Sequence, residues 1–207
     1  MRFVIHRILL FMLLIFVGKL PVSNAEKITT TTKINKRIEV VRFHSTVLNT
    51  SKQYAVVLPA NYKATKARNA IWPVMFLFHG RGRTERTLID DPASRTALLQ
   101  AKFVTILIDG DDGWYIDSPR QPEQRYESYT TEVINHATKQ YPLSTHRSQR
   151  GLSGWSMGGY GATLFAAKHA THFSAVAPIM GLLDFPRGDL PAGQSYKVPL
   201  ARFGKNS

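Results

Sequence analysis

The residues that could do chemistry gather in one short stretch, 154–158, which reads Gly-Trp-Ser-Met-Gly. This is a G-x-S-x-G pattern with Ser156 at its centre, between a strand-like run and a helix-like one. A serine in that setting lies on a tight, strained turn, and small residues must flank it because larger side chains would collide with neighbouring elements. The turn also places the hydroxyl at a helix N-terminus, where free N–H groups favour an oxyanion. We therefore predict that Ser156 is an acyl-transfer nucleophile, with a glycine-rich structural turn as the alternative.

The composition excludes other kinds of site. The chain contains no cysteine, which excludes a cysteine nucleophile, a thiolate metal site and stabilisation by disulfides. Its seven histidines show no H-E-x-x-H or comparable spacing, so the sequence predicts no metal and no cofactor.

The first 25 residues are typical of a signal peptide for export. Arg2 and Arg7 form a basic start, residues 8–17 an apolar core, and residues 23–25, Ser-Asn-Ala, a small-residue cleavage site. The apolar run is shorter than the about 20 residues that a membrane span needs, and no other segment could cross a bilayer. We expect an exported protein, periplasmic or extracellular, without a membrane span once the signal is removed; an uncleaved anchor is the alternative.

The formal charge of the chain is +13 at pH 7, which raises the question of a nucleic-acid partner. The basic residues are scattered, with loose groups only at 27–42 and 63–68, and no recognition helix or aromatic RNA-binding motif is present. We expect a solvated basic surface and no nucleic-acid partner. Attraction to anionic envelope surfaces or acidic polysaccharide is the second interpretation.

Apolar periodicity divides the rest of the chain into alternating strands and helices. Residues 26–37 are rich in threonine and lysine, lack periodicity, and are predicted to form a flexible arm. The strands predicted after it are 38–47, 53–58, 74–78, 103–108, 150–155 and 173–180, and the helices are 93–99, 123–140 and 157–168. This alternation predicts one three-layer α/β domain over 38–207, with a mostly parallel central sheet.

Polar residues with chemical potential follow three of these strands. His79, Asp109 and Ser156 each come directly after a predicted strand. The carboxyl ends of parallel strands share one edge of a sheet, and functional loops belong there. We therefore expect these three residues to lie at the same edge.

Four motifs then occur in a recognisable order. They are Phe78-His79-Gly80, Asp109-Gly110 followed by residues 114–119, Tyr126-Glu127, and residues 154–162. In this order they resemble the esterase D-like family of α/β-hydrolases, which includes S-formylglutathione hydrolases, feruloyl and acetyl esterases and mycolyltransferases. The resemblance runs from about residue 38 to residue 183 and implies the α/β-hydrolase fold.

The resemblance also implies a mechanism. Ser156 would be the nucleophile, and the backbone N–H groups of Met157 and Arg81 would form the oxyanion hole, two donors from separate loops converging on one oxygen. The implied activity is hydrolysis of a small-molecule or carbohydrate-linked carboxylic ester through an acyl-enzyme, without a cofactor. An acyltransferase of the same fold and a non-catalytic esterase-like binding protein are the alternatives.

The other residues of these motifs have structural interpretations. We expect His79 to orient its loop, and Asp109 and Glu127 to organise a loop and a helix rather than to act as acids. Trp114 and Tyr115 could wall a substrate cleft, but aromatic packing under a loop explains them equally well. Trp155, beside the nucleophile, faces either the core or the site.

The pattern breaks downstream of Ser156. In this fold the triad follows the order nucleophile, acid, histidine. His169 and His172 fall on or just after the predicted helix 157–168, and Asp184 and Asp189 follow the next strand too closely to supply a triad acid. We find no triad acid or base and expect a domain that is incomplete at its C-terminus, with an unpaired apolar edge strand.

Three interpretations stay open at this point. The first is a truncated esterase with the family's site and little activity, because loss of the base of a serine triad costs on the order of 10⁴–10⁶ in turnover. The second is a rearranged triad with His79 or His146 as the base. The third is a non-catalytic relative that binds acylated ligands or a partner chain that supplies the missing strands. The oligomeric state is open.

Overall fold

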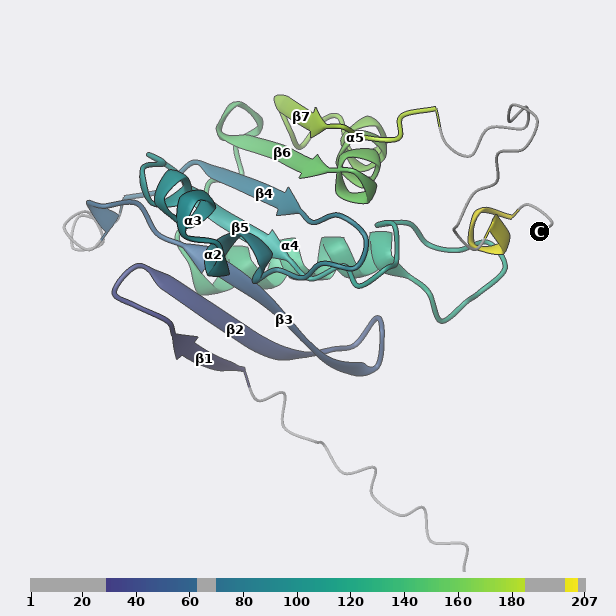
Figure 1. Ribbon diagram of the computed structural model, residues 1–207, viewed down its shortest axis with the longest axis horizontal. Coiled ribbons are helices and arrows are strands. Elements are labelled where there is room, and N and C mark those ends of the chain that lie inside the picture. The colour runs from purple at the N-terminus through teal and green to yellow at the C-terminus, as the bar shows by residue number, and fades with distance from the viewer. Residues whose placement is uncertain (1–28, 63–69, 185–199, 205–207) are drawn as a thin grey trace, which may run out of the picture.

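The structure is a computed structural model that describes residues 29–62, 70–184 and 200–204 (Figure 1). The predicted signal peptide, residues 1–25, lies outside the described residues. The described part folds into one sheet with helices on both of its faces.

Every predicted strand and helix is present, and each of its ends lies within three residues of the predicted one. The strands are β1 (Thr30–Lys33), β2 (Ile38–Ser45), β3 (Thr50–Val57), β4 (Val74–Phe78), β5 (Val104–Ile108), β6 (Arg150–Trp155) and β7 (Ala175–Ile179). The α-helices are α2 (Thr87–Asp90), α3 (Pro92–Leu99), α4 (Tyr126–Gln140) and α5 (Met157–Lys168), and the short 3₁₀ helices are η1 (Arg147–Gln149) and η2 (Leu200–Phe203).

The strand order is β1-β2-β3-β5-β4-β6-β7. The pairs β5–β4, β4–β6 and β6–β7 are parallel, while β1–β2, β2–β3 and β3–β5 are antiparallel. All strands except β1 and β3 therefore run in one direction, so the mostly parallel sheet is confirmed, with an antiparallel extension on one side. Parallel neighbours need crossover connections, and the helices supply them.

The register aligns the ends of the central strands. Phe78, the last residue of β4, pairs with Ile108 of β5 on one side and with Gly154 of β6 on the other. The residues that follow these strands are thus held at the same level. This arrangement brings His79, Asp109 and the Ser156 turn to one edge of the sheet, as the sequence predicts.

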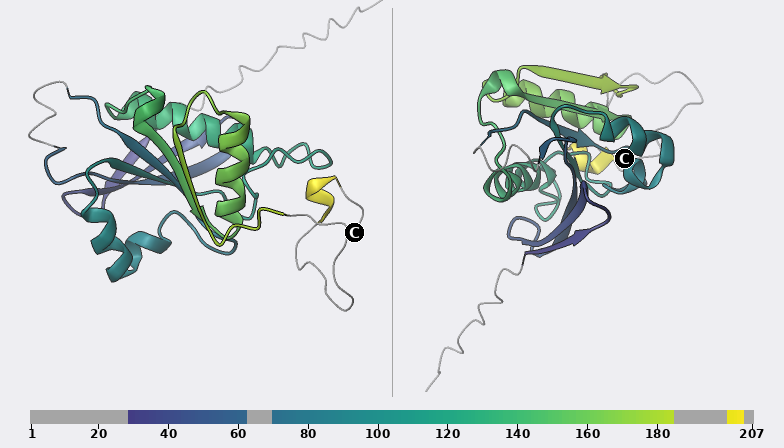
Figure 2. Two further views of the ribbon diagram at one scale, coloured as in Figure 1. Left: turned by 90° about the horizontal axis from the view of Figure 1, so that it is seen from above. Right: turned by 90° about the vertical axis from the view of Figure 1, so that its left-hand side faces the viewer.

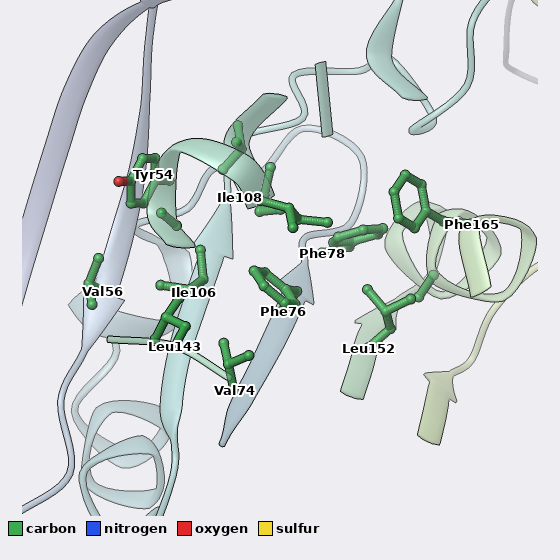
Figure 3. Close-up of a cluster of buried hydrophobic side chains, with 14 of the residues drawn as sticks. Tyr54, Val56, Val74, Phe76, Phe78, Ile106, Ile108, Leu143, Leu152 and Phe165 are labelled. Carbon is green, nitrogen blue, oxygen red and sulfur yellow. The ribbon is translucent and has the colours of Figure 1, made fainter. Parts of the chain in front are cut away.

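Two apolar cores fix the layers. The larger core lies between the sheet and helices α4 and α5, and it includes Phe76, Phe78, Leu152 and Phe165 (Figure 3). The smaller one includes Val57, Ile89 and Leu107 and lies on the side of α2 and α3. Figure 2 shows α4 on one side of the sheet and α2 and α3 on the other, the predicted three layers.

The sheet has β1 as one edge strand, which sequence analysis did not predict, and β7 as the other, which it did. Residues 26–37 were predicted to form a flexible arm, but within them β1 pairs with β2 and is a regular edge strand. Its side chains are all exposed, so it carries no apolar alternation that sequence analysis could detect. At the other edge, β7 pairs only with β6 among the described residues.

Strand β7 and the turn after it expose apolar side chains, as the sequence predicts for an unpaired edge. The exposed fractions are 42% for Val176, 52% for Ile179 and 80% for Met180. An apolar strand with free backbone N–H and C=O groups is a template for pairing with another chain. We therefore expect this edge to drive self-association.

A double lysine substitution tests this expectation. Val176→Lys together with Ile179→Lys places charge on β7 and is expected to slow aggregation of the purified protein, measured by light scattering against concentration, because edge charges oppose strand addition. The control is Ile71→Lys, at a position that is 61% exposed and outside the regular strands. An equal effect of the control would show that net charge, and not the β7 edge, governs aggregation.

Candidate active site

Ser156 lies between the end of β6 and the start of α5. It occupies the N-cap position of α5 with φ 53° and ψ −119°, a conformation that is strained for a residue with a side chain. Its N–H donates to the Ile179 carbonyl at 2.9 Å, and its carbonyl accepts from the Tyr160 N–H at 3.0 Å. The predicted strand–turn–helix setting of the serine is thereby confirmed.

The glycines around Ser156 are required by close backbone contacts. A Cβ atom on Gly154 would lie 2.4 Å from the Gly158 carbonyl oxygen, and a Cβ on Gly158 would lie 2.2 Å from the carbonyl oxygen of Phe78. Both distances are far below a van der Waals contact. The start of α5 thus lies directly against the end of β4, which confirms that only glycine fits two residues before and two residues after the serine.

The loop after β4 is tied to the loop after β5. The Tyr115 hydroxyl accepts from the His79 N–H at 2.9 Å, and the Gly110 N–H donates to His79 Nε2 at 2.9 Å. One turn further, the Gly82 N–H donates to Asp112 Oδ1 at 2.7 Å. These bonds position the segment that contains Arg81, whose N–H is the second oxyanion donor in our prediction.

Both ring nitrogens of His79 are engaged. Nε2 accepts the Gly110 N–H, so the ring proton is on Nδ1, which donates to the Gly80 carbonyl oxygen at 2.8 Å. The side chain is only 2% exposed. His79 therefore has no free lone pair for a substrate or for Ser156, and the interpretation of His79 as an improvised base is wrong.

The His79 ring instead orients a peptide group. Its bond to the Gly80 carbonyl fixes the plane of the Gly80–Arg81 peptide. In a trans peptide the N–H points opposite to the C=O, so the Arg81 N–H is directed away from the His79 ring. At the other loop, Met157 is the first residue of α5, where N–H groups have no intrahelical acceptor. Donation by Arg81 and Met157 to one oxyanion stays a prediction.

His146 and His169 lie far from the nucleophile. His146 precedes η1 at the opposite end of β6, and a strand rise of about 3.3 Å per residue puts it on the order of 20 Å or more from Ser156. This contradicts the alternative of His146 as a base. His169 follows the last turn of α5, about 20 Å along the helix from Ser156. Neither His146 nor His169 is placed to act as the base, and Asp189 lies outside the described residues.

Buried charges stabilise the loops at the carboxyl ends of the central strands. Lys52 Nζ, on a side chain 6% exposed, lies 2.9 Å from Asp109 Oδ2 and 2.8 Å from Asp111 Oδ1. Burial alone would raise the pKa of Asp109, but the Lys52 ammonium and the Asp111 N–H, which both donate to its carboxylate, outweigh burial and lower the pKa. Asp109 is thus an ionised organiser of its loop, as the sequence suggests. Lys52 was missed because it precedes the alternation from which the strand was predicted.

Glu127 and the aromatic residues also have structural roles. Glu127 Oε2 accepts from Lys168 Nζ at 2.5 Å and joins α4 to α5. Tyr115 is 1% exposed and stacks on Phe78 with ring centroids 4.2 Å apart. Tyr115 therefore belongs to the core and does not wall a cleft.

Trp114 lies in a small aromatic cluster beside the helix of the nucleophile. Its ring meets those of Tyr160 and Phe203 edge to face, at centroid distances of 5.5 and 5.3 Å. Phe203 belongs to η2, which sequence analysis did not predict because a single 3₁₀ turn carries no periodic signal. Trp155 packs against the oxyanion loop, since its Nε1 would lie 2.8 Å from a Cβ on Gly80.

Glu85 is a buried carboxyl group near this network. It is 1% exposed, its Oε1 accepts from Gln53 Nε2 at 2.7 Å, and its Oε2 has no hydrogen-bond partner. Burial, and secondly the charge of Asp109, raise the pKa of Glu85. Glu85 could not be singled out by sequence analysis because its environment arises only when the loop folds onto β3.

Two kinds of site do not occur among the residues that the structure describes. They contain no group of three or more His, Cys, Asp or Glu side chains that could hold a metal ion. Within the same ranges, no helix combines the length and the apolar character that crossing a bilayer requires.

Gly158→Ala tests the contact between α5 and β4. In an ordinary helix, alanine would stabilise by about 1 kcal/mol over glycine. Here the added methyl group collides with the Phe78 carbonyl, and we expect a loss of about 1–3 kcal/mol in the free energy of unfolding, measured by urea denaturation. Unchanged or increased stability would contradict the contact.

Glu85→Gln tests the buried carboxyl. Because the folded-state pKa of Glu85 is raised above the ordinary 4.5, its protonated form favours folding, and this stability is lost as the pH rises through the folded-state pKa. We expect the variant to gain about 1–3 kcal/mol in the free energy of unfolding at pH 8, the scale for a buried polar group without a partner, and less at pH 5.

Glu132→Gln is the control with the opposite sign. Burial alone would raise the pKa of Glu132, but hydrogen bonds from Ser45 and Thr46 lower it. Its stabilisation is present above the unfolded-state pKa and lost as the pH falls. This variant is expected to be less stable than wild type at pH 8. A Glu85→Gln variant that is destabilised in the same way would contradict our account of Glu85.

Comparison with known proteins identifies the family. Residues 45–196 match the family model described as "Putative esterase". An esterase of Mycobacterium tuberculosis is 26% identical over 91% of this chain and 45% of its own length. An acetyl esterase of Caldicellulosiruptor saccharolyticus is 20% identical over 69% of this chain and 55% of its own length. The chain thus spans about half the length of the curated relatives it matches.

Solved structures show the same fold. A ferulic acid esterase superposes with a TM-score of 0.60 at 25% identity, covering 72% of this chain and 62% of that one. The S-formylglutathione hydrolase of Staphylococcus aureus superposes with a TM-score of 0.57 at 22% identity, over 72% and 58% of the two chains. The family model covers most of the chain and the structures share its architecture, and the chain therefore belongs to the Putative esterase family, with the α/β-hydrolase fold.

Proposed function

We propose that the protein is an exported serine carboxylic ester hydrolase that works through an acyl-enzyme on Ser156. The observation that carries the proposal is the strained Ser156 turn, at φ 53° on the N-terminus of α5, in a chain of the esterase family. The names of the relatives, an esterase and an acetyl esterase, support the reaction class. Export rests on residues 1–25 alone.

The proposed reaction has two displacement steps. Ser156 Oγ attacks the ester carbonyl carbon and forms a C–O bond, the alcohol leaves with a proton, and water then attacks the acyl-enzyme and releases the carboxylic acid. In each step the carbonyl oxygen becomes an oxyanion, held by the N–H groups of Met157 and Arg81. Loss of one such donor typically costs about 3–4 kcal/mol in the transition state.

Proton transfer from Ser156 to a general base is the step for which we identify no group among the described residues. Without one, catalysis rests on the oxyanion hole and binding, and turnover is lower by a factor on the order of 10⁴–10⁶. We therefore expect weak turnover if Ser156 and the oxyanion hole act without a general base. An acyltransferase would use the same acyl-enzyme with an alcohol in place of water, and analysis of products with an added alcohol separates the two.

The proposed substrate is a small-molecule or carbohydrate-linked ester. The acetyl esterase and the ferulic acid esterase among the similar proteins suggest short acyl or aromatic acyl groups. The excess of basic residues, which gives the full chain a net charge of +13, is compatible with an ester carried on an acidic polysaccharide.

A fluorophosphonate probe tests the nucleophile. Ser156 Oγ would displace fluoride at phosphorus, and we expect mass spectrometry of the labelled chain to place the adduct on Ser156. Ser156→Ala should abolish both labelling and the hydrolysis of p-nitrophenyl acetate. The control Ser153→Ala, whose hydroxyl donates to the Ala177 carbonyl inside the sheet, should retain both.

The outcomes separate the three function classes. Labelling with turnover supports the hydrolase. Labelling without turnover supports an acyl-enzyme that lacks a base or needs another acceptor. A folded chain that binds an ester equally well as wild type and as Ser156→Ala, without labelling, would overturn the proposal in favour of a binding protein.

A further inference from the structure

Arg150 is a buried cation that the proposed reaction does not use. It is the first residue of β6, at the opposite end of that strand from Ser156, and is 7% exposed. Its guanidinium carbon lies 4.9 Å from the ring centroid of Phe173 and 5.4 Å from that of Phe76. The two rings cover part of the guanidinium by cation–π contacts, and its Nε atom is fully buried.

This guanidinium lacks an anionic partner among the residues that the structure describes. Among the described residues, no side-chain nitrogen of Arg150 takes part in an ion pair or a hydrogen bond. Its Nε atom is fully buried and has no acceptor. A buried charge normally has a paired counter-charge because desolvation is costly. The donors of Arg150 therefore call for an acceptor from outside the described residues.

A cavity of about 110 Å³ adjoins the guanidinium. Helices α4 and α5 and the segment after α5 line it, with polar side chains at Thr131, Asn135, His169 and His172. The carboxylate that contacts this lining is Glu127, 3.6 Å from His169 Nε2, and it already accepts from Lys168. The cavity thus offers hydrogen-bond donors and a cation, and the acidic group beside it is occupied.

We propose that Arg150 and this cavity form a binding site for one small oxyanion, a phosphate, sulfate or carboxylate group. The planar guanidinium presents parallel N–H donors that match two oxygens of such a group. The Asn135 amide can donate to a remaining oxygen, while the Thr131 hydroxyl proton is already donated to the Glu127 carbonyl. The volume admits a single anionic group and excludes a nucleotide, since drug-sized ligands need about 300 Å³ or more.

The site is independent of the ester chemistry. A strand rise of about 3.3 Å per residue separates Arg150 from Ser156 by roughly 20 Å along β6. An anion held there would join β6 to α4 and α5 and would stabilise the folded state by an amount that grows with the logarithm of the anion concentration above the dissociation constant. Failure of the proposed esterase activity would leave this proposal unchanged.

Thermal unfolding of the full chain with added anions tests the site. Inorganic phosphate, sulfate and acetate are titrated separately, with chloride at equal ionic strength as the reference. We expect the Tm to rise with the logarithm of the anion concentration and to reach a shift of about 5–10 °C at 100 times the dissociation constant for the anion that fits. The anion with the largest shift identifies the group that the site prefers.

Two variants locate the effect. Arg150→Met keeps an apolar side chain between Phe76 and Phe173 and removes the donors, so the anion-dependent shift should vanish. Arg147→Met removes the same charge three residues earlier, where Nε bonds the Ala170 carbonyl, and should retain the shift. If Arg150→Met does not fold, Asn135→Leu fills the cavity while Arg150 stays, and it should abolish the shift.

The proposal is overturned if none of the three anions raises the Tm of wild type beyond chloride. It is also overturned if Arg147→Met loses the shift as fully as Arg150→Met, since the effect would then be general charge screening. Retention of the full shift in Asn135→Leu would place the anion elsewhere.

Discussion

The contact between the backbone of Gly158 and the end of β4 constrains the rest of the candidate site. Because the helix start lies against the Phe78 carbonyl, the turn before it has room for only one residue between strand and helix, and Ser156 takes up a positive φ. The same contact sets the loop after β4 beside the helix N-terminus. The geometry of the serine and that of its two predicted oxyanion donors thus have one cause, which is the packing of a glycine on a strand end.

The strain of this turn is held by rigid surroundings. Trp114 and Tyr115 also have positive φ values, 58° and 57°, and conformations of this kind persist only where the environment determines them. Both side chains are almost fully buried, and Tyr115 stacks on Phe78 while its hydroxyl accepts the His79 N–H. Burial of aromatic surface therefore stabilises a loop that, in turn, fixes the peptide group carrying the Arg81 N–H.

Local pattern and partner geometry explain what the sequence could and could not predict. The strand–turn–helix around Ser156 was predictable because apolar periodicity and glycine spacing are local properties. The partners of Lys52, Glu85 and Arg150 depend on which strands are neighbours, and the order β3-β5-β4-β6 cannot be derived from periodicity. The tautomer of His79 likewise follows from the Gly110 N–H of another loop. That no base was found near Ser156 among the described residues was predictable only as a missing pattern, and the structure adds the distances that exclude His146 and His169.

A buried cation lies near each end of β6, in a chain that has more basic than acidic residues. The chain has 27 basic and 14 acidic residues, so carboxylates are too few to pair every cation. At the carboxyl end of the strands, Lys52 forms ion pairs with two carboxylates, Asp109 and Asp111, and these pairs hold the loop beside the nucleophile. At the amino end the cation is as deeply buried, but its described neighbours are aromatic rings. A buried cation in a chain short of carboxylates is stabilised most readily by an anion from solution, because burial removes water as the alternative partner.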